Sequence, residues 1–201
     1  MNQTIVCLTA LIALAACSSN PKKVIVYFKG NSTANAETKT ITVKDGAGAE
    51  EKTMDFNTAE KVSLKIEGLD EDATVEIPEN GLYIVNAKND TIIGSYQKYS
   101  DPKTSQTVIT QEQLKKDIDS LTQLTMGKNI SAANRNFYIL PKQAAKISNN
   151  IESFVVGPFH KMTSVAKEGD KEPEVYRFYS IKEIRETIQN LTKLTIAEKK
   201  Q

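Results

Sequence analysis

The side chains with the widest chemical repertoire are one histidine and two cysteines. His160 is the only histidine of the 201 residues, and Cys7 and Cys17 are the only cysteines. Thiol catalysis and thiolate metal sites need free cysteines with suitable partners. A Ser–His pair would have to use His160, and no motif places a serine on a strained turn beside it. The chain has no GxSxG, HExxH or glycine-rich phosphate motif. We therefore expect no catalytic residue, no metal site and no cofactor, with His160 at the surface.

Carboxylates are the remaining candidates for chemistry. Two segments are rich in them, DGAGAEE at 45–51 and GLDEDATVE at 68–76. Neither has the alternating oxygen ligands of a calcium loop, so we interpret both as acidic turns. A carboxylate pair that hydrolyses glycosidic bonds has no local signature, and the chain has no tryptophan on which a sugar could stack. A carboxylate-dependent hydrolase stays open as the less favoured alternative.

The N-terminal apolar segment is too short to cross a membrane. Residues 5–16 are apolar except for Thr9. As a helix they would rise about 18 Å at ~1.5 Å per residue, against a hydrocarbon core of ~30 Å. This length is typical of the apolar part of a secretory signal peptide. A buried first element of a cytosolic protein is the alternative.

The apolar segment ends in LAAC (14–17), which resembles the lipobox of bacterial lipoproteins. The resemblance implies a signal peptide at 1–16, cleavage before Cys17, a lipid on Cys17, and a short linker at 17–23. The mature chain would then have neither a free thiol nor a disulfide. The resemblance covers 1–17 alone, and no family is indicated for the mature domain.

The resemblance also bears on location. Ser18 follows Cys17, where an inner-membrane retention signal has aspartate, and the acidic stretch typical of surface-exported lipoproteins of Bacteroidetes is missing. This implies a lipid-anchored protein of the cell envelope, on the periplasmic face of the outer membrane in a Gram-negative cell. In a Gram-positive cell it would lie on the outer face of the plasma membrane. Lys22 and Lys23 either favour anionic headgroups, by about 1 kcal/mol each, or are solvated lysines at a strand start.

The charge of the chain is balanced. The formal net charge is +1, acids and bases are interspersed, and only three of the 26 basic residues are arginine. Nucleic acids bind to strongly basic surfaces, and bidentate recognition of phosphate favours arginine. We therefore expect no nucleic-acid partner.

Residues 24–99 have the pattern of short strands. KVSLKIEG at 61–68 alternates apolar and polar side chains, and about seven such segments follow one another at roughly ten-residue spacing with turn residues between them. Asn80-Gly81 is a hairpin signal between two of them. We expect an antiparallel β-sandwich of immunoglobulin-like architecture, without the Cys–Trp–Cys pattern of true immunoglobulin domains.

Residues 105–201 change to a mixture of strands and helices, so the predicted fold class is α+β. Two amphipathic helices are expected near 110–126 and 180–195, each beginning with the spacing of a capping box. We expect their apolar stripes to pack on a sheet. Strands are expected at RNFYIL, SFVVG and EVYRFY, and PKQAAKI is a candidate short helix. The two helices align at a shift of 70 residues, which either a duplication or the shared amphipathic pattern explains.

Two features could carry binding or modification. In YRFY, strand alternation puts Tyr176 and Phe178 on one face and Arg177 and Tyr179 on the other. These aromatics either belong to the core or leave one face open as a binding surface. Asp-Thr-Ile at 90–92 resembles the O-glycosylation site of Bacteroidetes envelope proteins, which makes Thr91, in an expected exposed turn, a candidate site.

Three functions are compatible with these features. The first is a membrane-anchored envelope lipoprotein that binds a protein partner without catalysis, at a sheet edge or a helix–sheet junction. The second is an immunity or inhibitor lipoprotein acting against an envelope enzyme. The third is the carboxylate-dependent hydrolase. The absence of a catalytic motif and the anchor close to the domain favour the first, which we take as the working hypothesis.

Overall fold

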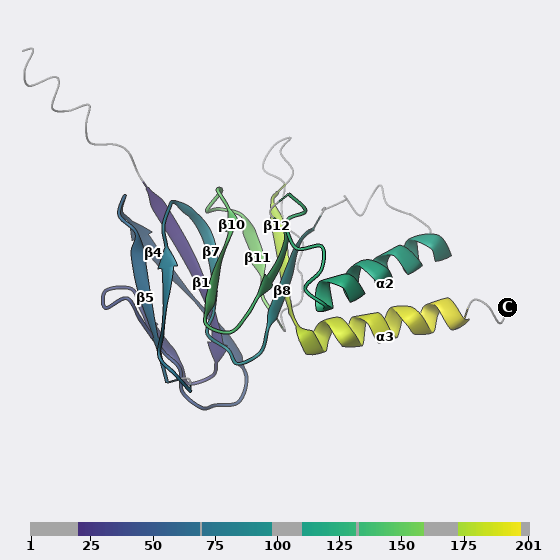
Figure 1. The fold of residues 1–201 in the computed structure, drawn as a ribbon, viewed down its shortest axis with the longest axis horizontal. Coiled ribbons are helices and arrows are strands. Elements are labelled where there is room, and N and C mark those ends of the chain that lie inside the picture. The colour runs from purple at the N-terminus through teal and green to yellow at the C-terminus, as the bar shows by residue number, and fades with distance from the viewer. Residues whose placement is uncertain (1–19, 69, 98–109, 132, 159–172, 198–201) are drawn as a thin grey trace, which may run out of the picture.

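The fold is α+β, as the sequence predicts. The structure is a computed structural model that describes residues 20–68, 70–97, 110–131, 133–158 and 173–197. Within these residues the chain forms three four-stranded sheets and two helices (Figure 1). The predicted signal peptide, Cys17 and His160 lie outside the described residues.

The central sheet, sheet A, has the strand order β10-β7-β1-β4. Its strands are β1 (Pro21–Lys29), β4 (Ala49–Asn57), β7 (Gly81–Asn86) and β10 (Gln143–Ser148). β1 pairs antiparallel with β4 and parallel with β7. Both β1 and β7 are nearly continuous apolar runs, VIVYF and LYIV, because each is covered on both faces.

Sheet B covers one face of sheet A. It has the order β2-β3-β5-β6, with the parallel pair β3–β5 between two antiparallel pairs. Its strands are β2 (Thr33–Asn35), β3 (Thr40–Thr42), β5 (Val62–Glu67) and β6 (Ala73–Ile77). Val62, Leu64 and Ile66 alternate inward from β5 and pack with Val24, Val26 and Phe28 of β1.

Sheet C covers the opposite face of sheet A. Its order is β11-β12-β8-β9, with β11 and β12 parallel. Its strands are β8 (Ile92–Gln97), β9 (Asn136–Ile139), β11 (Phe154–Val156) and β12 (Val175–Ser180). Tyr176 and Phe178 of β12 pack against Tyr27 and Ile84 of sheet A. The molecule is thus a stack of three sheets, B, A and C, with the helices beyond sheet C (Figure 1).

The predicted immunoglobulin-like antiparallel sandwich is not what the structure shows. Each of the three sheets contains one parallel pair. The hairpin predicted at Asn80-Gly81 is wrong, because β6 belongs to sheet B and β7 to sheet A. The strand pairing also crosses residue 99: β10 completes sheet A, and β8 pairs with β9 and β12. Short apolar runs do not specify a partner strand, so local patterns predicted strands without their pairing.

The candidate short helix at PKQAAKI is instead β10. Ala144 and Ala145 pair with Val85 and Ile84 of β7 in an antiparallel ladder. Alanine favours helix intrinsically, but the open edge of β7 offers a row of main-chain partners to this segment. Tertiary pairing therefore outweighs a local propensity of less than about 1 kcal/mol per residue.

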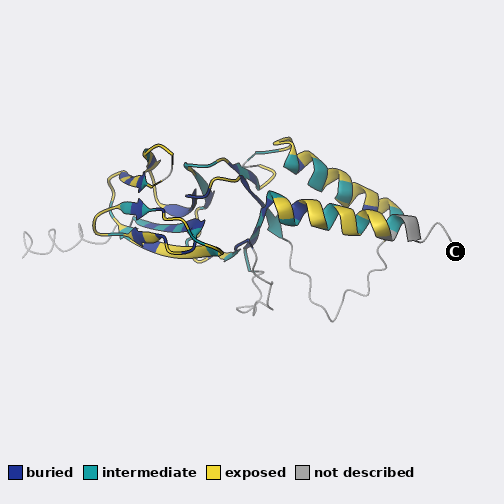
Figure 2. Cartoon of the chain, turned by 90° about the horizontal axis from the view of Figure 1, so that it is seen from below, coloured by how far each residue is buried: buried dark blue, intermediate teal, exposed yellow. Residues whose placement is uncertain are grey.

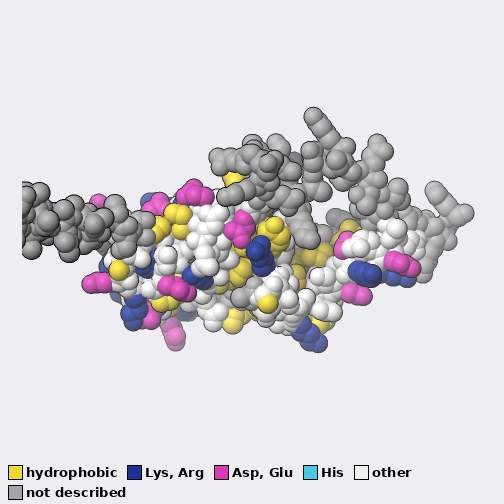
Figure 3. Space-filling view, turned by 90° about the horizontal axis from the view of Figure 1, so that it is seen from above, with side chains coloured by type: hydrophobic (Ala, Val, Ile, Leu, Met, Phe, Trp, Pro, Cys, Tyr) yellow, Lys and Arg dark blue, Asp and Glu magenta, His cyan; other side chains and the backbone are white. Residues whose placement is uncertain are grey.

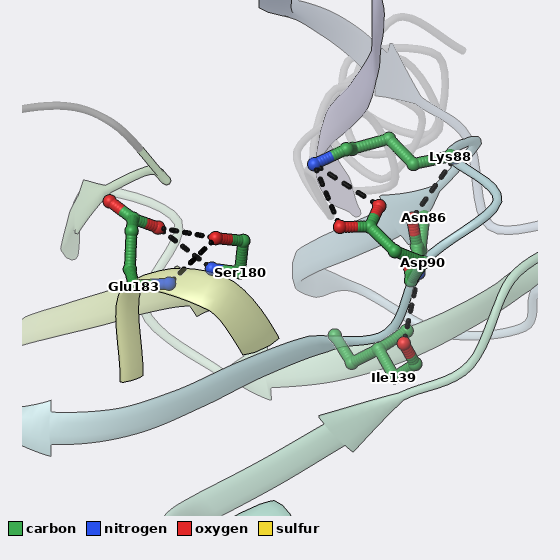
Figure 4. A network of polar contacts seen from close by, with 6 residues as sticks. All are labelled: Asn86, Lys88, Asp90, Ile139, Ser180 and Glu183. Carbon is green, nitrogen blue, oxygen red and sulfur yellow. Dashed lines mark hydrogen bonds and ion pairs between the residues drawn. The ribbon is translucent and has the colours of Figure 1, made fainter. Parts of the chain in front are cut away.

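Both predicted helices form, and their caps agree with the sequence. Helix α2 (Gln111–Thr125) begins at Thr110, whose Oγ1 accepts from the Gln113 N–H at 3.2 Å, while the Gln113 amide turns away to Asp117. Helix α3 (Ile181–Ala197) has the complete reciprocal box. The Glu183 N–H donates to Ser180 Oγ at 3.2 Å, and the Ser180 N–H donates to Glu183 Oε2 at 2.8 Å (Figure 4).

The expectation that both apolar stripes pack on a sheet holds for their inner ends alone among the described residues. The helices pair with one another and reach away from the sheets (Figure 2). Only their inner ends, represented by Leu124 and Ile184, join the core with Ile93 of β8. Ile118 and Ile188, further out, are half-buried. Among the described residues, the outer turns pack on the partner helix, and acidic and basic side chains lie on the outside of the helical part (Figure 3).

Candidate functional site

Four chain connections meet at the end of the sheet stack where β1 stops. The connections after β1, β3 and β7 each lead to a strand of another sheet. The connection after β5 leads to β6, in the same sheet B. The N-terminus enters β1 at the opposite end, at Pro21. We call the end at Lys29 the distal end and the end at Pro21 the proximal end.

Glycine allows the connections of the distal end to touch. A side chain at Gly46 would overlap the carbonyl oxygen of Gly30, and one at Gly68 would overlap the carbonyl oxygen of Val43. Gly68 also has a φ of 83°, in the left-handed region that favours glycine. The two acidic turns predicted from the sequence are thereby held against neighbouring main chain.

Two adjoining hollows lie between these connections. One has a volume of about 200 Å³ and is lined by Asp45 and Asp70, and the other, of about 610 Å³, is lined by Gly48 and Asp90. Lys29, Lys88 and Asn89 line both. We call this pair the distal hollow. The larger part is shallow and open to solvent.

Lys88, which lines the distal hollow, is held in place. Its side chain is 8% exposed, and its ammonium lies 3.2 Å from Asp90 Oδ1. The turn that carries both residues is fixed by Asn86, which is fully buried (Figure 4). Asn86 Oδ1 accepts from the Lys88 N–H at 3.1 Å, and Asn86 Nδ2 donates to the carbonyls of Asp90 and Ile139, each at 2.9 Å. The lysine head group is thus positioned before any partner arrives.

The chemistry of the distal hollow is that of charge recognition. Two ammonium groups, Lys29 and Lys88, and two carboxylates, Asp45 and Asp70, line the smaller part. These groups can bind the carboxylate or amine side chains of another molecule. Within the described residues no group of three or more His, Cys, Asp or Glu side chains could hold a metal ion.

A second polar cluster lies at the proximal end. Glu174 Oε2 accepts from Ser153 Oγ at 2.5 Å and from Ser148 Oγ at 2.7 Å, and Oε1 accepts from the Tyr176 hydroxyl at 2.7 Å. Burial alone would raise the pKa of Glu174, but these hydrogen bonds and Arg135 outweigh it and hold the pKa below its usual range. A carboxylate held ionised in this way ties β10, β11 and β12 together and is poorly suited to act as a general acid.

The aromatic residues singled out in the sequence divide between two environments. Tyr176 and Phe178 are 1% and 0% exposed and belong to the core between sheets A and C, so their shared face is not an open surface. Arg177 and Tyr179 lie on the other face of β12, half-buried, with the guanidinium 4.8 Å from the ring centre of Tyr179. The core interpretation therefore holds for the first pair.

Two other residues, Thr91 and Lys22, differ from expectation. Thr91 is 8% exposed, so the expected exposed turn does not present this side chain, and O-glycosylation of the folded domain is not favoured. Lys22 is 1% exposed, and its ammonium donates to the carbonyl of Thr58, so it is neither solvated nor placed for headgroups. Lys23 pairs with Glu152 at 3.2 Å.

The distal hollow was not predicted from the sequence. Its acidic turns were recognised, but the lysines that face them are 59 residues apart in the chain. The sequence signal that could have indicated the hollow is the position of glycine-rich turns directly after strands. These turns mark chain connections, but they do not show which connections lie next to one another.

No family model, curated protein or solved structure matches the chain. None of the described helices is both long and apolar enough to cross a membrane. The function is accordingly argued from the arrangement of the sites.

Proposed function

We propose that the chain is a lipid-anchored envelope lipoprotein that holds a protein partner at its distal hollow without catalysing a reaction. The observation that carries the proposal is the position of the two ends of β1. The strand starts at Pro21, four residues after the lipobox cysteine, and stops at Lys29, which lines the hollow.

These positions set the distances from the membrane. Four extended residues reach about 14 Å, so a lipid on Cys17 would keep the proximal end close to the bilayer. The nine residues of β1 then extend about 30 Å further. The distal hollow would face away from the membrane, where a partner can approach it.

The polar groups support binding more than catalysis. Lys88 is fixed by Asp90 and Asn86, which lowers the entropy lost when a partner's carboxylate binds. The carboxylate of Glu174 is satisfied by hydroxyl groups at the other end of the stack. A partner surface with both acidic and basic side chains would complement Lys29 and Lys88 on one side and Asp45 and Asp70 on the other.

The anchor is tested first. Expressed in a bacterium, the chain should be shortened, labelled by radioactive palmitate, and partition into detergent. Cys17→Ser should remain unprocessed and unlabelled. Identical behaviour of the two proteins would contradict the lipoprotein proposal.

The binding role is tested by photo-crosslinking with a matched pair of positions. A photoreactive residue at Asn89 lies in the distal hollow, and one at Asn80, also exposed, lies at the proximal end. The proposal expects an envelope protein to be captured from Asn89 and lost when Lys29→Glu is added, with no such product from Asn80. The variant His160→Ala and treatment with chelator should leave capture unchanged. Equal capture from both positions would refute the distal site.

One observation favours a second candidate. Asp45 and Asp70 line the same small hollow, as a carboxylate-dependent hydrolase requires. Such an enzyme would release soluble fragments from purified cell-wall polymer, and Asp45→Asn with Asp70→Asn would abolish the release. The binding proposal expects no release by the unaltered chain. If the captured partner is an envelope hydrolase, the chain would act as an immunity or inhibitor lipoprotein against that enzyme.

A further inference from the structure

Within the described residues, strand β4 forms one edge of sheet A. All nine of its residues stay in unbroken register with β1, from Pro21 opposite Asn57 to Lys29 opposite Ala49. Within the described part of the chain β1 is the only strand that pairs with it. The strand contains no proline, glycine or bulge, so charged side chains are its only protection against pairing with other strands. Every second residue of β4 therefore directs its N–H and C=O groups outward.

A hollow of about 380 Å³ lies beside this edge. It is lined by Lys52, Thr53 and Met54 of β4 and by residues 34–37 of β2 and the turn after it. β2 is itself the edge of sheet B, so the edges of two sheets open on the same side. We call the β4 edge and this hollow the edge groove.

The two faces of β4 differ in chemistry. Met54 and Phe56 face sheet B and pack in the core shared by sheets A and B. Glu51 and Asp55 face the opposite side, because side chains alternate along a strand. A strand added beside β4 would follow the same alternation. It would direct one row of side chains toward the hollow, whose lining is mixed, and the other row toward Asp55. Glu51 adds negative charge on that side, with its carboxylate beside Tyr27.

The charge of β4 decides between occupants. The strand carries three acidic residues and one basic residue, Lys52, a net charge of about −2. A second copy of β4 would add the same negative charge, and like charges on adjacent strands are destabilising. A basic segment would neutralise it. The edge groove therefore suits an extended segment in which lysine or arginine alternates with apolar residues.

We propose that the edge groove binds an extended, basic–apolar alternating segment of a protein partner by strand addition to β4. Main-chain hydrogen bonds to the outward groups supply the affinity, and the hollow, whose mixed lining includes Ala34, Ala36 and Met54, leaves room for an apolar side chain. This inference rests on the proposed binding role and gives the partner a second, chemically defined contact.

The test uses the full chain in detergent and the synthetic peptide KVKIKVK as probe. Hydrogen exchange is measured amide by amide along β4. Strand addition should slow exchange at every second residue of Ala49–Asn57, the outward set, and leave the inward set unchanged. The peptide EVEIEVE, of opposite charge, and KVKPKVK, which lacks a central N–H donor, should produce no such alternation.

A matched pair of charge reversals separates the edge groove from general attraction. Asp55→Lys changes the β4 edge, and Asp119→Lys makes the same change on the exposed face of α2. Asp55→Lys should weaken the binding of KVKIKVK by about fivefold at low salt, whereas Asp119→Lys should have little effect. Circular dichroism of both variants checks the fold.

Three results would overturn the proposal. The first is uniform or absent protection of β4 by the peptide. The second is an equal effect of Asp55→Lys and Asp119→Lys. The third is alternating protection that already exists without peptide and grows with protein concentration, because a second copy would then occupy the edge. None of these results bears on the lipid anchor or on capture from Asn89, so this inference and the proposed function fail separately.

Discussion

Asn86 of β7 donates its side-chain amide to the main-chain carbonyl of Ile139 in β9 at 2.9 Å. This one contact joins the distal end of sheet A to the distal end of sheet C. The same amide group also holds the turn that carries Lys88, so the stability of the stack and the position of the lysine depend on one buried residue.

Asn86→Ala is expected to cost about 2–4 kcal/mol of unfolding free energy. The change removes three hydrogen bonds and leaves buried main-chain groups without partners. Urea denaturation measures the loss, and Asn80→Ala, at an exposed position, is the control that should stay within about 0.5 kcal/mol. Similar values for the two variants would show that the Asn86 network contributes little.

Gly94→Ala is expected to destabilise the chain by about 1–3 kcal/mol. Gly94 of β8 lies opposite Phe178 of β12, and a Cβ at this position would overlap the phenyl ring. The ring belongs to the core between sheets A and C, so it has little room to move. Thermal unfolding compares this variant with Ser95→Ala, the next residue of the strand, for which a change of about 0.5 kcal/mol or less is expected.

Substitutions along the helices should fall into three groups. Ile184→Asp buries a charge where α3 meets the sheet core and should cost at least about 3 kcal/mol. Ile188→Asp lies further out, half-buried between the helices, and should cost about 1–2 kcal/mol. Lys116→Asp is exposed and should change stability by about 0.5 kcal/mol or less. Equal costs at Ile184 and Ile188 would indicate that the outer turns are as well packed as the base.

Acid should weaken the fold through Glu174. Its pKa is lower in the folded chain than in the unfolded chain, so the unfolded state takes up the proton first. The carboxylate therefore stabilises the fold above its ordinary pKa of 4.5, and this contribution is lost as the pH falls through the folded value. Urea unfolding between pH 7 and pH 3 should show a flatter profile for Glu174→Gln than for the unaltered chain. An unchanged slope would contradict the assignment, and Glu60→Gln, an exposed acid, serves as the control.

Alkali should weaken the fold through Tyr176. Burial, and then the hydrogen bond and negative charge of Glu174, raise the pKa of Tyr176 from 10.0 to about 12. The unfolded chain loses this proton first, so stability should fall as the pH rises from 10.0 toward about 12. Tyr176→Phe should remove this part of the decline, and Glu174→Gln should lower the pH at which tyrosinate absorbs at 295 nm. If stability declines equally in the Tyr176→Phe variant, another tyrosine causes the decline.

Local features were predictable where neighbouring residues decide the structure. Thr110 and Ser180 begin their helices because their hydroxyls reach N–H groups three residues away, and the strand around Val62, Leu64 and Ile66 forms because alternation places every second side chain on one face. The core position of Tyr176 and Phe178 also follows from alternation on β12, once one face of that strand is covered.

The tertiary structure decided which segments meet. Pairing of Ala144 and Ala145 with β7 turned an apparent helix into a strand, and pairing of the helices with one another moved Ile188 away from any sheet. Lys29, Asp45, Asp70 and Lys88 come together only because three sheets stack with their connections at one end. A sequence records which residues are apolar and where the chain turns, because those depend on near neighbours. The pairing of strands and the assembly of the distal hollow depend on free-energy differences among whole arrangements of the chain, which no single segment contains.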